Sequence, residues 1–230
     1  MSPGLPLNRI ERATLGAQIA EQIRTSVLQG AFEPGHQLSE IALAEHFGTS
    51  RGPIREALQT LVNEGLLKRE SHRGVFVPVV TDEDIADIYR ARGAVETAAM
   101  KHIIAVGSGA DVRTRLDKVV DEMAAAADAD EWARVVDLEM QFHSEVVKGA
   151  DSPRLSRMYS TLIDETRLCL ILTIASPGRY DLVDEHRHLA ALLDTQDPQP
   201  AIEAVEAHMR EATEALHRQR AEKTSDHGTQ

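Results

Sequence analysis

The segment 38–77 limits the possible folds of this chain more than any other, because two short helical patterns are followed there by a hairpin pattern. Apolar residues recur at helical spacing from Leu38 to Phe47, and Gly48 interrupts them. The next helix is expected to begin at Ser50, a residue type that caps helix N-termini. Two helices joined by a sharp turn are the arrangement with which many proteins place one helix in a groove of DNA.

The second of these helices is expected to have a buried apolar face and a basic edge. Pro53 is tolerated in its first turn, where backbone amides have no helical partner, and Gly65 suits the left-handed residue that ends a helix. Arg51 and Arg55 lie one turn apart beside the apolar face, so both can reach phosphates or guanine edges. The apolar positions recur at steps of three and four residues, and they are Ile54, Ala57, Leu58, Leu61 and Val62.

A β-hairpin with a basic tip is expected directly after this helix. The sequence predicts short strands at 66–69 and 75–78, and the turn between them contains His72, Arg73 and Gly74. A basic hairpin beside a helix that reads DNA would be a wing. A helical hairpin followed by an ordinary surface turn is the alternative, since arginines also occur near helix starts in proteins that do not bind nucleic acid.

Residues 14–78 resemble the winged helix-turn-helix of the GntR family of transcription regulators. The resemblance implies that arginines of the second helix touch bases and phosphates and that the wing tip enters the minor groove. Ile41, where some members have arginine, and Gly52, in place of the usual threonine, are departures that bear on the operator sequence. The matching motifs are GAFEPG at 30–35, LSEIALAE at 38–45, SRGPIREAL at 50–58, EGL at 64–66 and RGVFV at 73–77. The residues thereby assigned to DNA binding are Arg51, Gly52, Pro53, Arg55, His72, Arg73 and Gly74.

The net charge of −12 is unusual for a DNA-binding protein, but its distribution along the chain is uneven. Residues 1–80 contain 8 Lys and Arg and 8 Asp and Glu, so the whole excess of negative charge lies beyond residue 80. A neutral head with a local basic edge can bind phosphates on one face, whereas the acidic remainder would repel DNA. DNA binding is therefore expected to depend strongly on salt.

Composition favours a mainly helical protein of the reducing cytoplasm. Hydrophobic residues make up 42% of the chain but aromatic residues only 3%, which favours helices over sheets. No apolar run approaches the length needed to cross a membrane, and the N-terminal residues lack the core of a signal peptide. Cys169 is the one cysteine and has no partner for an internal disulfide.

A domain boundary is predicted near residue 80, between a winged helix-turn-helix domain at 1–80 and an all-helical domain at 81–220. Thr81 can cap a new helix whose first turn is acidic. Six helices and no strand are expected as far as about residue 219, and the polar residues 221–230 are expected to form a disordered tail. The breaks between helices are expected at 107–109, 128–130, 151–153, 176–178 and 197–198.

Three histidines and a glutamate of the helical half form a candidate metal site. Glu139 lies one turn before His143, a spacing that allows both side chains to bind one cation. His143, His186 and His208 each share a helix face with apolar residues, so they point into the core. Burying them is costly unless a common partner satisfies them, and a divalent metal could do so. The alternative is that each histidine is hydrogen-bonded separately in the core.

Residues 82–218 resemble the FCD effector-binding domain of the FadR-type GntR subgroup. Its metal-binding members carry Asp-x3-His, then Glu-His-Arg, then a distal histidine, and His143, His186 and His208 occur here in that order. Glu139 replaces the usual aspartate, which keeps the charge but lengthens the side chain. The resemblance implies a metal bound by these four residues, with zinc expected first and nickel or manganese as alternatives.

A ligand for a regulator is expected to bind beside this metal. Arg92 and Arg167 each lie on an apolar helix stripe, where an arginine can bind the carboxylate of a small organic acid. Tyr89, one turn before Arg92, belongs to the same expected site. The alternative is that each arginine pairs with a buried acidic residue, for instance Arg92 with Glu96.

Together these patterns predict a homodimeric transcription regulator, a repressor by expectation, that binds an inverted-repeat operator and responds to a small carboxylate. Two alternatives remain open, and the first belongs to another class of protein. A metal-dependent hydrolase with an accessory DNA-binding head would also contain three histidines and a carboxylate, although no separate general base is evident. A regulator could also sense the metal itself, or an acyl thioester without metal.

Overall fold

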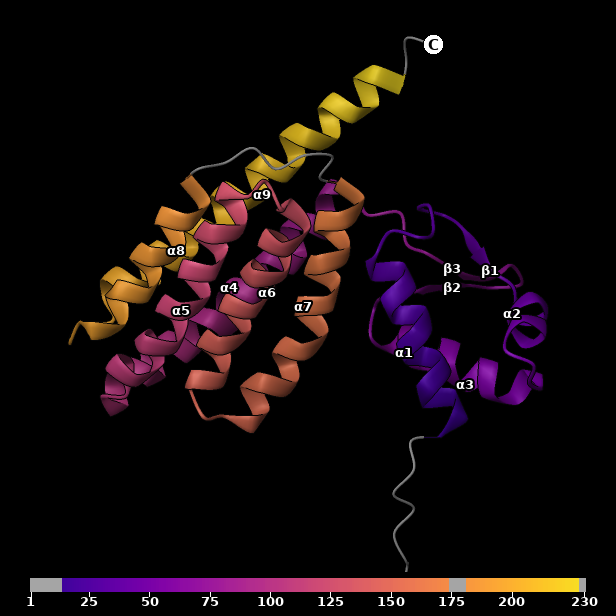
Figure 1. Ribbon diagram of the computed structural model, residues 1–230, viewed down its shortest axis with the longest axis horizontal. Helices are drawn as coiled ribbons and strands as arrows, with labels where there is room; N and C mark the ends of the chain where they lie inside the picture. Colours follow the sequence, from indigo (N-terminus) through magenta and orange to yellow (C-terminus); the bar gives the residue numbers. More distant parts are fainter. Residues whose placement is uncertain (1–13, 174–180, 228–230) are drawn as a thin grey trace, which may run out of the picture. The chain divides into compact units, whose positions relative to one another are not determined.

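The computed structural model describes residues 14–173 and 181–227. The chain divides into two compact units, Met1–Pro78 and Val79–Gln230 (Figure 1). This division lies close to the predicted boundary near residue 80. The fold is mainly helical, as predicted, with one small sheet in the first unit and helices alone among the described residues of the second.

The first unit is a winged helix-turn-helix in which three helices accompany a three-stranded antiparallel sheet of order β1-β3-β2. Helices α1 and α3 pack together through fully buried residues such as Ile19, Ile23 and Ile54. This packing fixes the direction in which α3 presents its exposed arginines. The elements are α1 Leu15–Leu28, β1 Gln37–Leu38, α2 Glu40–His46, α3 Arg51–Asn63, β2 Lys68–Glu70 and β3 Gly74–Phe76.

The start of the helix-turn-helix differs from the sequence prediction. Leu38, expected in the first helix, is buried in β1 and pairs with Val75 of β3. Helix α2 begins only at Glu40, because the hydroxyl of Ser39 caps it by accepting a hydrogen bond from the amide of Ala42. Ser50 occupies the predicted N-cap of α3, but its side chain makes no capping hydrogen bond.

The hairpin is present but shorter than predicted. Leu66 and Leu67 are buried core residues that precede β2 instead of belonging to it. Gly65 has φ 77°, the left-handed conformation expected after α3. His72 also has a positive φ, 63°, in the tight turn between β2 and β3.

The second unit is a helical bundle of six α-helices and one short 3-10 helix within its described residues (Figure 1). Helix α4 is central, since it packs against α6, α7 and α9. It begins with a reciprocal capping box between Thr81 and Asp84, which confirms the predicted cap. The elements are α4 Asp82–Val106, α5 Gly109–Asp128, α6 Trp132–Gly149, α7 Pro153–Thr173, α8 Asp181–Ala191, η1 Leu192–Asp194 and α9 Gln199–His227.

One boundary of this unit was predicted wrongly. Helix α9 continues to His227, whereas the sequence was expected to become disordered from Ala221. Ala221, Glu222 and Lys223 are residue types that favour helix, which is consistent with the longer helix. The predicted break at 176–178 lies outside the described residues.

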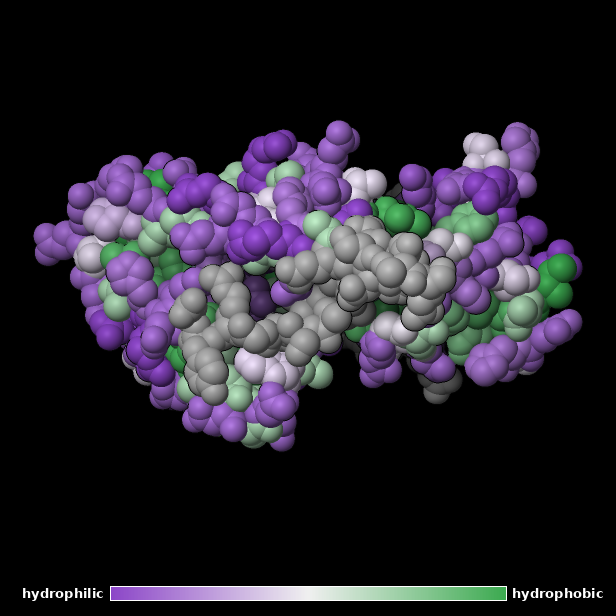
Figure 2. All heavy atoms as spheres, turned by 90° about the horizontal axis from the view of Figure 1, so that it is seen from above, coloured by the Kyte–Doolittle hydropathy of each residue, from purple (hydrophilic) through white to green (hydrophobic). Residues whose placement is uncertain are grey.

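The surface is polar on the face shown in Figure 2, where hydrophilic side chains predominate among the described residues. The exposed large apolar side chains among the described residues include Leu15, Ile41, Val79, Val106 and Met158. None of the helices among the described residues is both long enough and apolar enough to cross a membrane.

Candidate metal centre and DNA-binding surface

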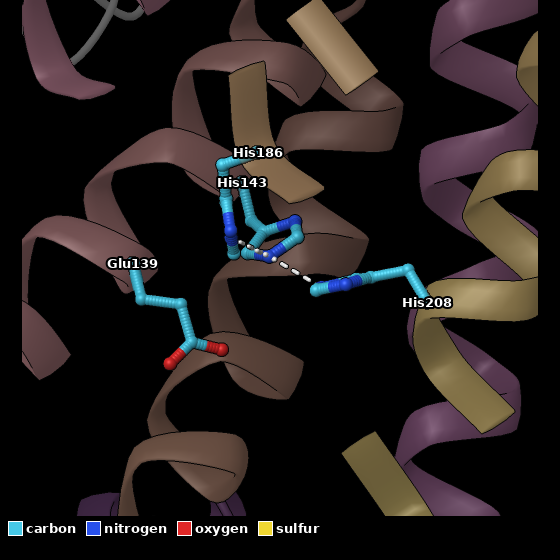
Figure 3. A group of neighbouring side chains, drawn as sticks. All are labelled: Glu139, His143, His186 and His208. Carbon is cyan, nitrogen blue, oxygen red and sulfur yellow. Dashed lines mark hydrogen bonds between the residues drawn. The ribbon is translucent and has the colours of Figure 1, made fainter. Parts of the chain in front are cut away.

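Four side chains from three helices of the second unit converge in the core (Figure 3). Glu139 and His143 come from successive turns of α6, His186 from α8 and His208 from α9. Each offers one ligand atom, and these four atoms lie within 4.8 Å of one another. All four residues are buried, with His143 and His186 wholly inaccessible. The structure thus brings together the four residues that the sequence singled out.

The three imidazoles face one another through their Nε2 atoms. Nε2 of His143 lies 3.2 Å from Nε2 of His186 and 3.2 Å from Nε2 of His208. The opposite nitrogen of His143, Nδ1, lies 2.7 Å from the Glu96 carboxylate, and Nδ1 of His186 lies 2.7 Å from the Leu182 carbonyl oxygen. Since both acceptors need a donor, these two rings carry their proton on Nδ1 and present lone pairs at Nε2.

Two lone pairs at 3.2 Å repel each other unless a cation or a proton lies between them. Burial lowers the pKa of His143 to about 4 and the pKa of His186 well below its usual value, so extra protons are disfavoured near neutral pH. Neutral imidazoles with a carboxylate are a donor set that suits zinc and similar divalent ions. The cluster of Glu139, His143, His186 and His208 could therefore hold a metal ion.

Glu96 connects this cluster to the rest of the core. Its Oε1 accepts hydrogen bonds from Arg92 Nε at 3.1 Å and from the Tyr159 hydroxyl at 2.9 Å, while Oε2 accepts from His143 Nδ1. Burial alone would raise the pKa of Glu96, but His143 and Arg92 lower it to about 2. Sequence reasoning found Glu96 only as a partner for Arg92. Its contact with His143 spans 47 positions and has no local signal.

Arg92 is fully buried and only partly satisfied. Its Nε pairs with Glu96, as the alternative prediction had it, but Nη1 and Nη2 have no hydrogen-bond partner among the described residues. Its guanidinium lies 5.0 Å from the ring centroid of Tyr89. An arginine with two unused donor groups in the core is suited to bind a planar anion.

Arg167 is placed differently from Arg92. It forms an ion pair of 2.5 Å with Asp137, and about a third of its side chain is exposed. Tyr89, by contrast, lines a cavity that also reaches Glu139. Of the three residues predicted to bind the effector, Arg92 and Tyr89 therefore adjoin the histidine cluster, and Arg167 is engaged by an acidic neighbour.

In the first unit, the predicted DNA-binding residues lie on α3 and on the hairpin. Arg51 and Gly52 are exposed at the start of α3, and Pro53 is half-buried in its first turn. Arg55 is 62% exposed and forms an ion pair of 2.7 Å with Glu40 of α2, a partner that sequence reasoning missed. The Arg55 guanidinium is therefore already bound to a carboxylate of the same unit.

The hairpin tip presents His72 and Arg73 to solvent. Arg73 pairs with Glu70 and lies over the ring of Phe76 at 5.2 Å. Gln37 of β1 donates a hydrogen bond of 2.5 Å to the Arg73 carbonyl oxygen. Gly74 has φ 114°, and a Cβ there would lie 2.9 Å from the Gln37 amide nitrogen, so the turn is fitted to glycine.

Comparison with known proteins supports the same division of the chain. The FCD domain model matches residues 87–211, and the model described as bacterial regulatory proteins, gntR family, matches residues 15–77. The gluconate operon transcriptional repressor of Bacillus subtilis is 26% identical over 201 residues, which cover 84% of this chain and 81% of that protein. The Escherichia coli transcriptional repressor GlaR is 29% identical over 199 residues, which cover 81% and 89%.

Solved structures agree at the level of the fold. Escherichia coli McbR/YncC has a TM-score of 0.74 at 21% identity and covers 90% of this chain and 99% of that chain. The curated relatives are transcription regulators and not enzymes, which removes the hydrolase alternative. Because the FCD model alone matches more than half of the chain, this protein belongs to the GntR family, as a transcription regulator of the FadR-type subgroup with a C-terminal FCD domain.

Proposed function

We propose that this regulator is a homodimeric repressor of the cytoplasm whose release from DNA is controlled by a small carboxylate bound beside a metal. The observation that carries the proposal is the pair of unpartnered guanidinium nitrogens of Arg92, buried next to the cluster of three histidines and Glu139. A buried donor without an acceptor is costly, so a ligand that supplies oxygen atoms there gains affinity.

Charge balance favours a monoanion. Glu96 offsets the charge of Arg92, and Glu139 offsets one charge of a divalent ion, while the imidazoles of the cluster are neutral as ligands. One positive charge then remains in a low-dielectric core. A single carboxylate would neutralise it and would accept the free Arg92 donors.

Zinc is the metal proposed for this site, with nickel and manganese as alternatives. Glu139, His143, His186 and His208 would hold it, and the metal would supply a positive centre that binds carboxylate oxygen. Element analysis of the purified protein and of His143→Ala tests this assignment. Unchanged metal content in the variant would remove His143 from the ligand set.

For the DNA-binding unit we propose contacts from Arg51, Arg55 and the wing residues His72 and Arg73. Their exposure at one end of α3 and at the hairpin tip supports this assignment. Two such heads would bind the halves of an inverted repeat. An effector can shift this equilibrium only if it binds the free protein and the DNA-bound protein with different affinities.

Isothermal titration with organic acids, in the presence and absence of operator DNA, tests the switch. The effector is expected to bind the free protein at least tenfold more tightly than the DNA complex. An acid that binds both forms equally is no effector, and release of DNA by the metal alone would favour the metal-sensor alternative.

A further inference from the structure

We propose that the effector of this protein is a monocarboxylic acid with an apolar body, in contrast to a polyhydroxylated acid such as a sugar acid. This inference rests on the proposed carboxylate site and names the class of compound that it accepts. It comes from a cavity of about 80 Å³ in the helical unit, whose wall includes Glu139 of the histidine cluster. That volume is several times what a single water molecule needs.

On every helix that contributes a ligand, the cavity wall includes a residue one helical turn away from that ligand. Leu182 precedes His186 by one turn on α8, and Ala212 follows His208 by one turn on α9. Val135 precedes Glu139 by one turn on α6, and Tyr89 precedes Arg92 by nearly one turn on α4. A ligand whose carboxylate occupies the Arg92 and metal end therefore has its remaining atoms directed into this cavity.

The lining is mostly apolar, and its polar residues are Tyr89, Glu139 and Gln219. Trp132, Leu170, Leu182 and Leu216 form much of the wall, and the indole N–H of Trp132 is already engaged by Asp130. A hydroxyl group placed among these side chains loses its hydrogen bonds to water and finds few replacements. An alkyl chain in the same place has no hydrogen bonds to water to lose, and its burial removes apolar surface from water.

The far end of the cavity limits the length of the ligand. Gln219 lines it, seven residues beyond Ala212 on α9, which is about 10 Å along a helix. The side-chain Oε1 of Gln219 is buried and has no hydrogen-bond partner among the described residues. The cavity thus offers an apolar passage of modest length that starts at the cluster and ends at one polar atom.

Calorimetric titration of the metal-loaded, full-length protein with three monocarboxylates tests the inference at constant ionic strength. Acetate probes the carboxylate site alone, hexanoate adds an apolar chain, and gluconate has the same six carbons but carries hydroxyl groups. Hexanoate is expected to bind at least tenfold more tightly than either acetate or gluconate. Tighter binding of gluconate than of hexanoate would overturn the apolar assignment and leave the carboxylate site standing.

A variant that narrows the cavity supplies the second measurement. Ala212→Leu is expected to weaken hexanoate binding at least tenfold and to leave acetate binding and metal content unchanged. Ala133→Leu makes the same change at an exposed position of α6 and is expected to alter neither ligand. Equal loss for acetate and hexanoate in Ala212→Leu would also overturn the inference. If no acid binds the wild-type protein, the proposed function fails together with the inference.

Discussion

At the scale of single residues, Glu96 is expected to control metal affinity without touching the metal. Its carboxylate holds the Nδ1 proton of His143 and thereby directs Nε2 toward the cluster. Glu96→Gln keeps the shape but removes the charge, and zinc affinity measured by competition with a chelator is expected to fall roughly 10- to 100-fold.

The matched control is Tyr159→Phe, which removes one donor to Glu96 but leaves the contact with His143 intact. Its zinc affinity is expected to stay within a few-fold of the wild type. Wild-type affinity in Glu96→Gln would show that His143 does not need this partner as a ligand.

The four cluster residues could be found from sequence because two of them lie one turn apart and all three histidines share faces with apolar residues. Glu96 could not be assigned this role, because its contacts with His143 and Tyr159 join helices that are distant in the chain. Local spacing reports which residues share a face. It does not report which carboxylate on another helix faces them.

Cys169 is expected to be chemically inert in the folded protein. Its side chain is fully buried, and burial raises the pKa of its thiol to about 12, so almost no thiolate exists at pH 8. Reaction with a thiol reagent such as dithionitrobenzoate at pH 8 is expected to be at least a hundredfold slower in native buffer than in denaturant. Complete native reaction within seconds would contradict the burial of this residue.

At the scale of elements, the contact between α5 and η1 is expected to depend on Gly109. A Cβ at this position would lie 1.9 Å from the backbone oxygen of Leu193, which only a backbone shift could relieve. Gly109→Ala is expected to lower the free energy of unfolding by about 1–3 kcal/mol, measured by chemical denaturation.

Gly93→Ala provides the control within the same unit. Its Cβ would lie 3.3 Å from the Cγ of Met209, a flexible side chain that can move by a few tenths of an ångström. Because alanine also favours helix over glycine, this variant is expected to be nearly as stable as the wild type. A smaller loss for Gly109→Ala than for Gly93→Ala would show that α5 and η1 are less closely packed than described.

Elements with their own caps and periodicity were predictable, and elements that exist through pairing were not. The capping box of Thr81 and Asp84 and the left-handed Gly65 both follow from local residue types. Strand β1 has two residues and forms only because Leu38 pairs with Val75 of β3. No periodicity can signal so short a strand.

At the scale of the whole molecule, charge is divided between the two units. The first 80 residues are neutral overall, and the net charge of −12 belongs to the remainder. We therefore expect affinity for DNA to come from a few local cations on α3 and the hairpin, because the acidic remainder repels phosphates. Affinity that depends on contacts between cations and phosphates is expected to fall strongly as the salt concentration rises.

The double variant Arg51→Ala/Arg55→Ala is expected to weaken operator binding by about 2–6 kcal/mol. It is also expected to reduce the slope of log affinity against log salt concentration by roughly 2, since each phosphate contact contributes about 0.9. Fluorescence anisotropy across a salt series measures both quantities. Arg90→Ala, which removes an exposed arginine from α4, is the matched control and is expected to leave both unchanged.

Glu40→Gln distinguishes a direct contact of Arg55 with DNA from a general repulsion of DNA by the Glu40 carboxylate. Glu40 holds the Arg55 guanidinium in the free protein, so DNA must displace it before Arg55 can bind a phosphate. Removing this competitor is expected to tighten operator binding severalfold in the wild-type background and to have a much smaller effect when residue 55 is already alanine. If Glu40→Gln tightens operator binding equally in the wild type and in Arg55→Ala, then Glu40 acts by repelling DNA. In that case Arg55 makes no contact with DNA that depends on its release from Glu40.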